Sequence, residues 1–362
     1  MRRVAFYAPL KPPNHPVPSG DREMARNLMT ALQATGAHVD LVSELRIYDG
    51  SGDIGHQRRL RKSAAAEVAR LTAGLIEHPV GAWVSYHNYY KSPDLVGPAI
   101  CKALDLPYIL IEATRAPKRL TGPWAGFAAD AEAACDAADV ILYMTRHDHE
   151  SLDRDRPPGQ LLVSLRPFLP ISNVGSPSIH TGGNRILCAG MMRPGDKLAS
   201  YEIVSETLRC LTDMPWKLDI AGDGPARGDV AALMAPFGDR VRFLGQLDQA
   251  GMSNAYAGAD LFFWPGVNEA YGMVYLEAQA AGLPVVAQAR PGVVDVLAPG
   301  DHPPPQAGAA ALAARIRLLL NDPDLGRTCG LAAQNYVRDH HLLDSAAKTL
   351  GAVLENLRAV AS

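Results

Sequence analysis

Cysteine is scarce in this sequence of 362 residues, which contains five of them. Their number is odd, they are scattered along the chain, and no Cys-x-x-Cys spacing occurs. This pattern argues against a disulfide framework or a zinc site. Most of the cysteines fall within apolar helix or strand patterns, so we expect reduced side chains buried in a core. They are Cys101, Cys135, Cys188, Cys210 and Cys329.

Long apolar runs are lacking as well. No segment offers about 18 continuous apolar residues, the length that a membrane-spanning helix needs. The apolar run near Met1 is too short for a signal peptide. We therefore expect a cytoplasmic protein.

An excess of charge of one sign is also absent. The chain has 35 basic and 38 acidic residues, for a formal net charge of -3. This balance gives no global indication of a nucleic-acid-binding protein. No Ser-His-Asp, HExxH or Walker pattern is present. Asp-x-Asp spacing occurs at 153–155 and 322–324, but both are in polar segments. We therefore expect no bound metal.

Apolar runs that predict strands alternate along the chain with amphipathic stretches that predict helices. This alternation is typical of parallel sheets covered by helices on both faces. We predict an α/β fold with two doubly wound, Rossmann-like sheets. The strands of the first sheet are predicted at 4–8, 39–42, 82–86, 108–111 and 140–143. Those of the second are predicted at 185–190, 216–221, 241–244, 260–264 and 284–287.

The length suits two domains of common size. The first is predicted at 1–168. A segment rich in Pro, Ser and Gly, 169–184, predicts a linker. The second domain is predicted at 185–340, and the helix at 341–362 is expected to pack back on the first domain.

The stretch at 268–287 carries two carboxylates, Glu269 and Glu277, that lie eight positions apart. A buried strand precedes them and Pro265 ends it, so a helix is predicted to begin near Tyr271. At ~100° per residue, eight positions return to nearly the same helix face. Gly272 would let a ligand approach the backbone. The unpaired N–H groups of the first turn suit a phosphate or a sugar hydroxyl, so a diphosphate-linked sugar fits this pattern.

The context of this pair makes an ordinary amphipathic helix the weaker interpretation. The two carboxylates flank Tyr271-Gly272-Met273, and Ala-Ala-Gly-Leu-Pro-Val-Val follows at 280–286. This arrangement resembles the donor site of retaining family 4 glycosyltransferases, the glycosyl transferases group 1. By that resemblance Glu269 meets the transferred sugar, the backbone of Tyr271, Gly272 and Met273 meets sugar and phosphate, and Glu277 holds the ribose hydroxyls.

The resemblance implies a GT-B fold, in which an N-terminal acceptor-binding domain and a C-terminal donor-binding domain face one another across a cleft. It also implies transfer of a hexosyl group from a nucleotide diphosphate sugar, UDP- or GDP-linked, to a hydroxyl acceptor with retention of anomeric configuration. The acceptor would be a glycan, a lipid or a small molecule, as in glycan or glycolipid biosynthesis. No cofactor or metal is implied.

Further donor-side candidates follow the strands of the second half. Arg193 and Lys197 place two cations around a Gly-Pro turn, where they would neutralise a diphosphate. A solvated turn is the alternative for such a pair. Gly222 resembles a glycine that closes a strand beneath the donor. Leu244 lies in a segment that resembles the one whose backbone reads the nucleobase edge.

Candidates for the acceptor or sugar side follow the strands of the first half. Gly20 precedes a helix whose N-terminus suits a phosphate, and a structural turn is equally compatible with it. His87 matches in position a histidine that such enzymes often have, although a lone histidine is more often structural. Glu112 stands where many relatives have a histidine. Arg115 is expected to pair with Glu112 or to bind an anionic acceptor, as are Lys118 and Arg119 nearby.

Basic residues cluster at Arg58, Arg59, Arg61 and Lys62 at the start of a predicted helix. A solvated face is one interpretation, and weak peripheral contact with anionic lipid at the inner membrane face is the other. Two rival functions also stay open: a GT-B sugar-nucleotide epimerase or hydrolase, and a non-catalytic sugar-nucleotide-binding protein.

Overall fold

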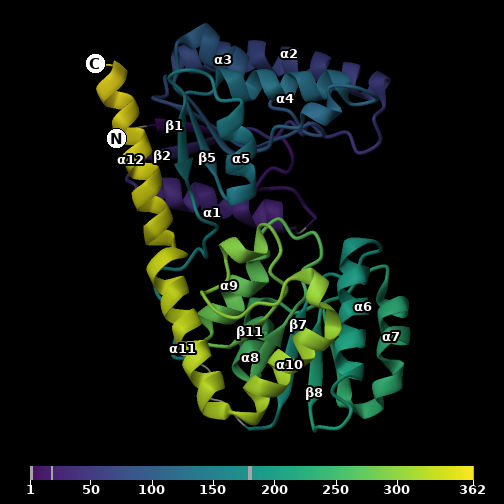
Figure 1. Ribbon diagram of the computed structural model, residues 1–362. Helices are drawn as coiled ribbons and strands as arrows, with labels where there is room; N and C mark the ends of the chain where they lie inside the picture. Colours follow the sequence, from purple (N-terminus) through teal and green to yellow (C-terminus); the bar gives the residue numbers. More distant parts are fainter. Residues whose placement is uncertain (1–2, 18, 178–181, 362) are drawn as a thin grey trace. The chain divides into compact units, whose positions relative to one another are not determined.

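A computed structural model describes residues 3–17, 19–177 and 182–361 (Figure 1). The chain divides into two compact units. The first comprises Met1–Arg166 with Leu343–Ser362, and the second comprises Pro167–Leu342. Each unit is built on its own parallel sheet.

The sheet of the first unit has six parallel strands in the order β2-β1-β3-β4-β5-β6. They are β1 (Arg3–Tyr7), β2 (His38–Ser43), β3 (Trp83–Asn88), β4 (Tyr108–Ala113), β5 (Val140–Tyr143) and β6 (Leu161–Ser164). All six residues of β3 are buried, as its central place in the sheet requires. The edge strand β6 has exposed or partly exposed residues throughout.

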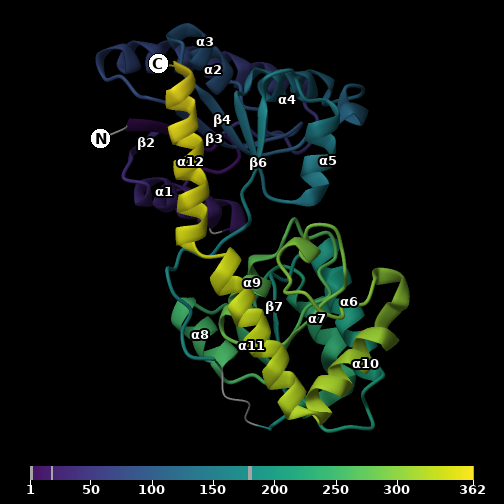
Figure 2. The same ribbon diagram turned by 60° about the vertical axis from the view of Figure 1, so that its left-hand side comes forward.

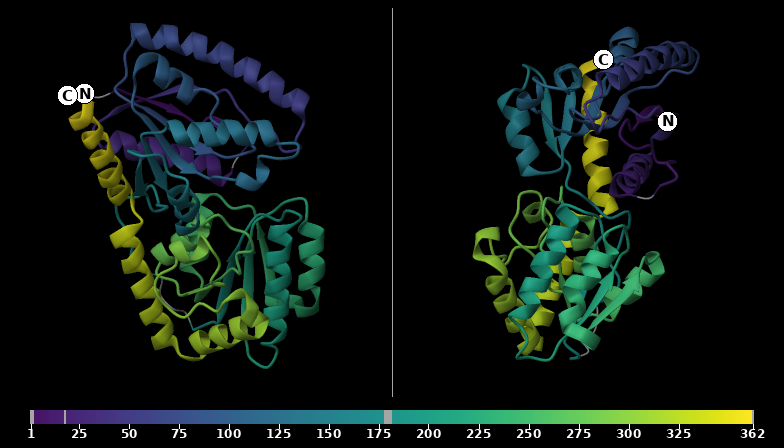
Figure 3. Two further views of the ribbon diagram at one scale, coloured as in Figure 1. Left: turned by 45° about the horizontal axis from the view of Figure 1, so that its top comes forward. Right: turned by 90° about the vertical axis from the view of Figure 1, so that its right-hand side faces the viewer.

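Helices cover both faces of this sheet (Figures 1 and 3). On one face α2, α3 and α4 pack together, and on the other α12 packs along α1. A short 3-10 helix, η1 (Pro117–Arg119), precedes α4. The helices are α1 (Gly20–Ala34), α2 (Ile54–Glu77), α3 (Gly97–Leu104), α4 (Ala125–Ala137), α5 (Arg146–Arg154) and α12 (Leu343–Ala361).

Local chemistry explains where two of these helices begin. Ser19 caps α1, since its side chain accepts a hydrogen bond from the backbone N–H of Arg22, and Met24, Leu28 and Leu32 form the buried stripe. Asp53 caps α2 and accepts from two backbone N–H groups of the first turn. Because of this cap α2 begins at Ile54.

The sheet of the second unit has five parallel strands in the order β11-β10-β7-β8-β9. They are β7 (Arg185–Ala189), β8 (Lys217–Ala221), β9 (Val241–Gly245), β10 (Leu261–Phe263) and β11 (Val285–Val286). The α-helices of this unit are α6 (Asp196–Arg209), α7 (Arg227–Met234), α8 (Gln249–Ala257), α9 (Met273–Ala280), α10 (Gly308–Asn321) and α11 (Pro323–His340). Short 3-10 helices lie at η2 (Ala235–Arg240), η3 (Val293–Asp295) and η4 (Pro305–Ala307).

Helices lie on both sides of this second sheet as well. On one side α6 packs on α7, and on the other α9 packs on α11 (Figure 1). The two doubly wound parallel sheets confirm the fold class predicted from the sequence. In both sheets the strand order reverses at one point, between β1 and β3 in the first unit and between β7 and β10 in the second. Open parallel sheets bind ligands outside the carboxyl ends of their strands at such points.

The described part of the predicted linker belongs to the second unit. Residues 178–181 of that segment lie outside the described residues. The segment is held by hydrogen bonds to the end of α11: Leu169 N–H donates to the His341 carbonyl over 2.8 Å, and Gln334 Nε2 donates to the Gly175 carbonyl over 3.1 Å. The final helix α12 begins at Leu343 and belongs to the first unit (Figure 2).

All five cysteines are free. Cys101, Cys135 and Cys188 are buried as expected, but Cys210 is exposed and Cys329 is partly exposed. Both exceptions occur on or beside amphipathic helices, where a small apolar residue tolerates the surface. Among the residues that the structure describes, no helix is long and apolar enough to cross a membrane.

Candidate functional site

The loop between β10 and α9 carries Glu269. This loop extends to Gly272, so the helix starts two residues later than the start near Tyr271 that the sequence predicts. The helix begins at Met273, because its N-cap, Gly272, has a left-handed backbone with φ 76°. Glu269 therefore lies in the loop, outside the helix. The prediction that Glu269 and Glu277 share one face of a helix is wrong, since only Glu277 lies in the helix. Gly266 and Asn268 in the same loop also have positive φ angles, of 76° and 51°.

The first turns of α6 hold this loop in place. Ser200 Oγ accepts a hydrogen bond from Val267 N–H over 3.0 Å. Asn268 Nδ2 donates to Asp196 Oδ2 over 2.8 Å. The ammonium group of Lys197 pairs with Glu269 Oε1. The segment after β7 and the segment after β10 are thus joined across the point where the strand order reverses.

Glu269 is the acceptor of two strong donors. Besides Lys197, the indole Nε1–H of Trp264 donates to Glu269 Oε1 over 2.8 Å. The side chains of Lys197 and Glu269 are 25% and 12% exposed, so the ion pair is largely shielded from water. The structure brings these two predicted catalytic residues together and adds Trp264. The sequence pattern predicts Trp264 merely as the end of a strand, although a buried indole N–H needs an acceptor.

Arg193 differs from Lys197 in its surroundings. It is exposed in the loop after β7. Within the described ranges its guanidinium group has no hydrogen bond or ion pair with another side chain. Arg193 is therefore available to an anion, whereas Lys197 would have to divide its charge between Glu269 and a ligand.

Glycines let the loops after β7 and β8 lie backbone against backbone. A Cβ at Gly222, whose φ is 137°, would stand 2.0 Å from the Gly190 carbonyl oxygen. A Cβ at Gly224 would stand 2.3 Å from the Met192 carbonyl oxygen. A Cβ at Gly190 would meet the ring of Trp264 at 2.8 Å. Gly222 is therefore required by this loop packing, independently of any ligand.

Glu277 is in α9, where the phenol of Tyr256 on α8 donates to its Oε2 over 2.8 Å. Burial raises the pKa of the Glu277 carboxyl, and the hydrogen bond from Tyr256 partly opposes that shift. Of the predicted backbone contacts, Tyr271 is buried, while Gly272 and Met273 are partly exposed.

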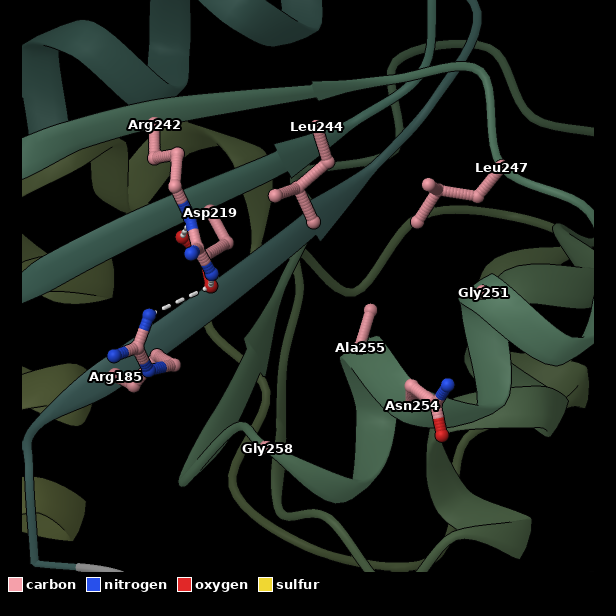
Figure 4. Close-up of a pocket in the computed structure, with 9 residues that line it drawn as sticks. All are labelled: Arg185, Asp219, Arg242, Leu244, Leu247, Gly251, Asn254, Ala255 and Gly258. Atoms are coloured by element: carbon pink, nitrogen blue, oxygen red, sulfur yellow. Dashed lines mark hydrogen bonds and ion pairs between the residues drawn. The ribbon is translucent and has the colours of Figure 1, made fainter.

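Leu244, the last predicted donor-side residue, lines a cavity of about 580 Å³ between the sheet and α8. Figure 4 shows it beside Leu247 and Ala255, opposite a charged cluster. In that cluster Asp219 accepts hydrogen bonds from Arg185 and Arg242, which braces β7, β8 and β9. Glu269, Glu277 and Lys197 do not line this cavity.

In the first unit, the structure places His87 and Glu112 at the carboxyl ends of β3 and β4. His87 Nδ1 lies 3.9 Å from Glu112 Oε1, and its Nε2 lies 3.5 Å from Asp21 Oδ1 in α1. Gly20 is the first residue of α1. These predicted residues therefore gather at the reversal point of the first sheet.

The expectation for Arg115 is corrected by its contacts. Its guanidinium donates to Glu132 Oε2 and to Asp136 Oδ1, each over 2.6 Å, and the side chain is 3% exposed. These carboxylates of α4 occupy Arg115, so it is unavailable to Glu112 or to a ligand. The motif could not reveal this pairing because the partners lie about 20 residues later in another element.

The comparisons with known proteins all find similarity to glycosyltransferases. A family model described as "Glycosyl transferases group 1" matches residues 183–322. Over 103 residues the chain is 42% identical to a phosphatidyl-myo-inositol mannosyltransferase of Mycobacterium leprae, covering 26% of this chain and 28% of that protein. Over 267 residues it is 26% identical to a D-inositol 3-phosphate glycosyltransferase of Frankia alni, covering 65% of this chain and 64% of that protein.

The likeness to solved structures extends over nearly the whole chain. Sucrose-phosphate synthase from Thermosynechococcus elongatus matches with a TM-score of 0.74 at 18% identity, covering 99% of this chain and 100% of that chain. At this level of identity the likeness shows the fold, which is that of GT-B glycosyltransferases.

The glycine packing predicts the effect of a single methyl group. We expect Gly222→Ala to lower the free energy of unfolding by about 2–5 kcal/mol, since a Cβ there is both strained and overlapping. Gly228→Ala is the matched control: it lies on α7 with no atom within 4 Å of its Cβ, so a gain of about 0.5–1 kcal/mol is expected. Urea unfolding monitored by circular dichroism measures both. Equal stability of the two variants would contradict the packing.

Proposed function

We propose that this chain, whose residues 183–322 match the glycosyl transferases group 1 model, transfers a hexosyl group from a nucleotide diphosphate sugar to a hydroxyl acceptor with retention of configuration. The observation that carries the proposal is the Lys197–Glu269 pair, with Trp264, at the reversal point of the second sheet. A shielded cation beside a carboxylate, at the edge where parallel sheets bind ligands, suits a ligand that joins a phosphate to a sugar.

The proposed reaction occurs on one face of the sugar. The bond between the anomeric carbon and the donor phosphate oxygen breaks, and the acceptor oxygen bonds to that carbon from the same side. The departing phosphate takes the proton of the acceptor hydroxyl. Arg193 and Lys197 stabilise the negative charge that develops on the phosphate, in place of a metal ion. Glu269 orients the sugar while its ring acquires positive charge.

Glu277 would bind the nucleotide rather than the reacting atoms. An ionised carboxylate accepts hydrogen bonds from the two ribose hydroxyls, and Tyr256 already fixes its orientation through Oε2. Backbone contacts near Leu244 would read the edge of the base. They do not reveal whether the base is uracil or guanine, so UDP- and GDP-linked donors are both proposed.

A phosphorylated or otherwise anionic acceptor is proposed for the first unit. The names of two relatives specify phosphatidyl-myo-inositol and D-inositol 3-phosphate. In this chain Lys91 and Arg119, in the loops after β3 and β4, lie 5.6 Å and 4.9 Å from the ring centroid of Tyr90. Both also lie 5.7 Å from the ring of Trp124. Two cations held by aromatic rings support binding of an anionic group.

The rival functions differ from transfer in their products. An epimerase or hydrolase would release an altered or free sugar and would need no acceptor. A non-catalytic binding protein would bind the donor without turnover. The presence of Glu269, Lys197, Arg193 and Glu277 argues against a non-catalytic binding protein, whereas an epimerase or hydrolase would keep the same nucleotide site.

A screen of nucleotide sugars tests the donor directly. We expect one UDP- or GDP-linked sugar to stabilise the protein by ~2.7 kcal/mol at 100 times its dissociation constant, read as a shift in the thermal midpoint. Incubation of that donor with inositol phosphates or phosphatidylinositol, followed by mass spectrometry, should then show a glycoside. Free sugar without glycoside would indicate the hydrolase, and no stabilisation by any donor would contradict the proposal.

Two variants separate the proposed roles of the carboxylates. We expect Glu277→Gln to weaken donor binding by about 10-fold or more, because a charged acceptor of two hydrogen bonds is lost. Wild-type affinity should fall as the pH is lowered towards the raised pKa of Glu277, and this dependence should be absent from the variant. Glu269→Ala should mainly reduce kcat, by about 100-fold or more. Glu202→Gln, on the exposed side of α6, is the control. Unchanged kinetics in both variants would refute the site.

Weak membrane contact is proposed for the exposed cations of α2. Arg58, Arg59 and Lys62 are exposed, although Arg59 lies 3.9 Å from Asp53, whereas the partly buried Arg61 is paired with Asp130 over 2.7 Å. Each exposed cation contributes ~1 kcal/mol at an anionic surface, so the binding should be weak and reversible.

Flotation with vesicles measures this contact. The wild type should float with vesicles that contain anionic phosphatidylserine and not with neutral ones, and 0.5 M salt, at about a 4 Å screening length, should abolish it. Arg58→Gln/Lys62→Gln should reduce flotation, while the charge-matched control Lys102→Gln/Arg209→Gln should not. Equal flotation with both kinds of vesicle would contradict the electrostatic contact.

A further inference from the structure

Two neighbouring strands of the first unit carry the same unusual backbone conformation. His87 in β3 and Glu112 in β4 have φ angles of 73° and 58°, although neither is a glycine. Tyr86 pairs with Ile111 and Asn88 with Ala113, so His87 and Glu112 occupy the same level of the sheet. Left-handed backbone costs a residue with a side chain about 1–2 kcal/mol. Two such residues side by side indicate a constraint on where their side chains point.

The side chains that this backbone directs are close together and largely buried. His87 and Glu112 have side chains that are 11% and 13% exposed, and 3.9 Å separates Nδ1 from Oε1. The imidazole lies on the ring of Tyr86, with 4.1 Å between the centroids. Nε2 faces Asp21 Oδ1 at 3.5 Å but makes no hydrogen bond with any residue in the described part of the chain.

The surroundings of His87 are acidic on every side that bears charge. Asp21 faces it from α1, Glu112 from β4 and Asp148 from α5. The pKa of His87 is raised, because these carboxylates outweigh the burial that would lower it. Burial raises the pKa of Glu112 to about 7, against the opposing charge of His87. The two groups are close enough, at 3.9 Å, for their titrations to be coupled.

The two aspartates near His87 are themselves held by other side chains. Thr114 and Thr145 donate to Asp148 over 3.0 Å and 2.6 Å, which holds its carboxylate in place. Lys11 lies near Asp21 and, with His87, lowers the pKa of that carboxyl despite its burial. Asp21 is therefore charged at neutral pH.

We propose that Glu112 is a positioning residue that acts through His87: it keeps the imidazole charged and fixes its ring, so that Nε2–H is offered to an oxygen atom of a ligand at the carboxyl edge of the first sheet. Nε2 approaches Asp21 no closer than 3.5 Å and makes no hydrogen bond with the described residues, so a ligand oxygen would supply the hydrogen bond that this buried N–H lacks. The inference rests on the proposed glycosyl transfer, in which such an oxygen belongs to a sugar or acceptor hydroxyl. It explains why a carboxylate suits position 112 in this chain.

A purely structural ion pair would behave differently. It would contribute to stability, but its removal would leave the pH dependence of catalysis unchanged. The pH profile of catalysis is therefore the decisive readout, and titration of the histidine shows whether the Glu112 carboxylate raises its pKa. The chain has 11 histidines, and comparison with His87→Gln assigns the signal of His87 in the NMR spectrum.

The experiment follows the His87 signal with pH in the full-length wild type, in Glu112→Gln and in Glu112→Asp. We expect the pKa of His87 to be lower in Glu112→Gln than in the wild type, and to stay raised in Glu112→Asp, which keeps the charge. Glu150→Gln, exposed on α5, is the control and should leave the titration unchanged. An unchanged His87 titration in Glu112→Gln would overturn the proposal.

The kinetic part uses the donor and acceptor identified by the screen. We expect kcat/KM of Glu112→Gln to fall by about 10- to 100-fold at pH 7.5, with its alkaline limb displaced to lower pH, and Glu112→Asp to recover part of the loss. Parallel pH profiles in the wild type and Glu112→Gln would overturn it. Failure of the proposed function is distinguishable, because it would appear as no turnover in the wild type while the NMR titration still decides the pair.

Discussion

The second unit depends on one ion pair, between Lys197 in α6 and Glu269 in the loop after β10. Two parallel strands that lie next to each other at the reversal point diverge into helices on opposite sides, so nothing in the sheet itself joins the segments that follow them. The ion pair joins them, with Asn268 and Val267 bonded to the same turns of α6. Residues about 70 positions apart in sequence thereby form one surface.

This arrangement has an energetic consequence for binding. A partly buried ammonium and carboxylate have lost much of their hydration, and each compensates the other. A phosphate that approached Lys197 would share the ammonium with Glu269, which would free part of the carboxylate for sugar hydroxyls. Binding of a ligand with both groups is therefore favoured over binding of a phosphate or a sugar alone. Arg193 is exposed and has no side-chain partner among the described residues. It would contact the phosphate without giving up an existing ion pair.

Whether a feature can be predicted from the sequence depends on how far apart along the chain its interacting residues lie. The parallel sheets were predictable because buried strands and amphipathic helices leave local patterns, and the Glu269–Glu277 stretch because its neighbours resemble a known motif. The helix start at Met273 was not, since the local sequence does not reveal that Gly272 adopts the left-handed backbone that delays the helix. Trp264 and the partners of Arg115 depend on side chains brought together by the fold, and such contacts leave no local pattern.

The two units use the reversal point of their sheets in a related way. In the second unit a residue that follows the first strand, Lys197, meets Glu269, which follows the strand across the reversal point. In the first unit Asp21, which follows β1, meets His87 at the end of β3. The signs of charge are exchanged, with the cation before the reversal point in one unit and after it in the other.

The cation is a lysine in one pair and a histidine in the other, and these residues suit different ligands. Lysine is a compact point charge, suited to a phosphate whose own charge does not vary near neutrality. Histidine changes its charge in that range, and Glu112 beside it titrates at about 7. Under the proposed role of His87, recognition at the first unit would then respond to pH through the coupled groups His87 and Glu112. Glu112 lies 3.9 Å from His87, and through this contact its carboxylate would make the first pair sensitive to pH.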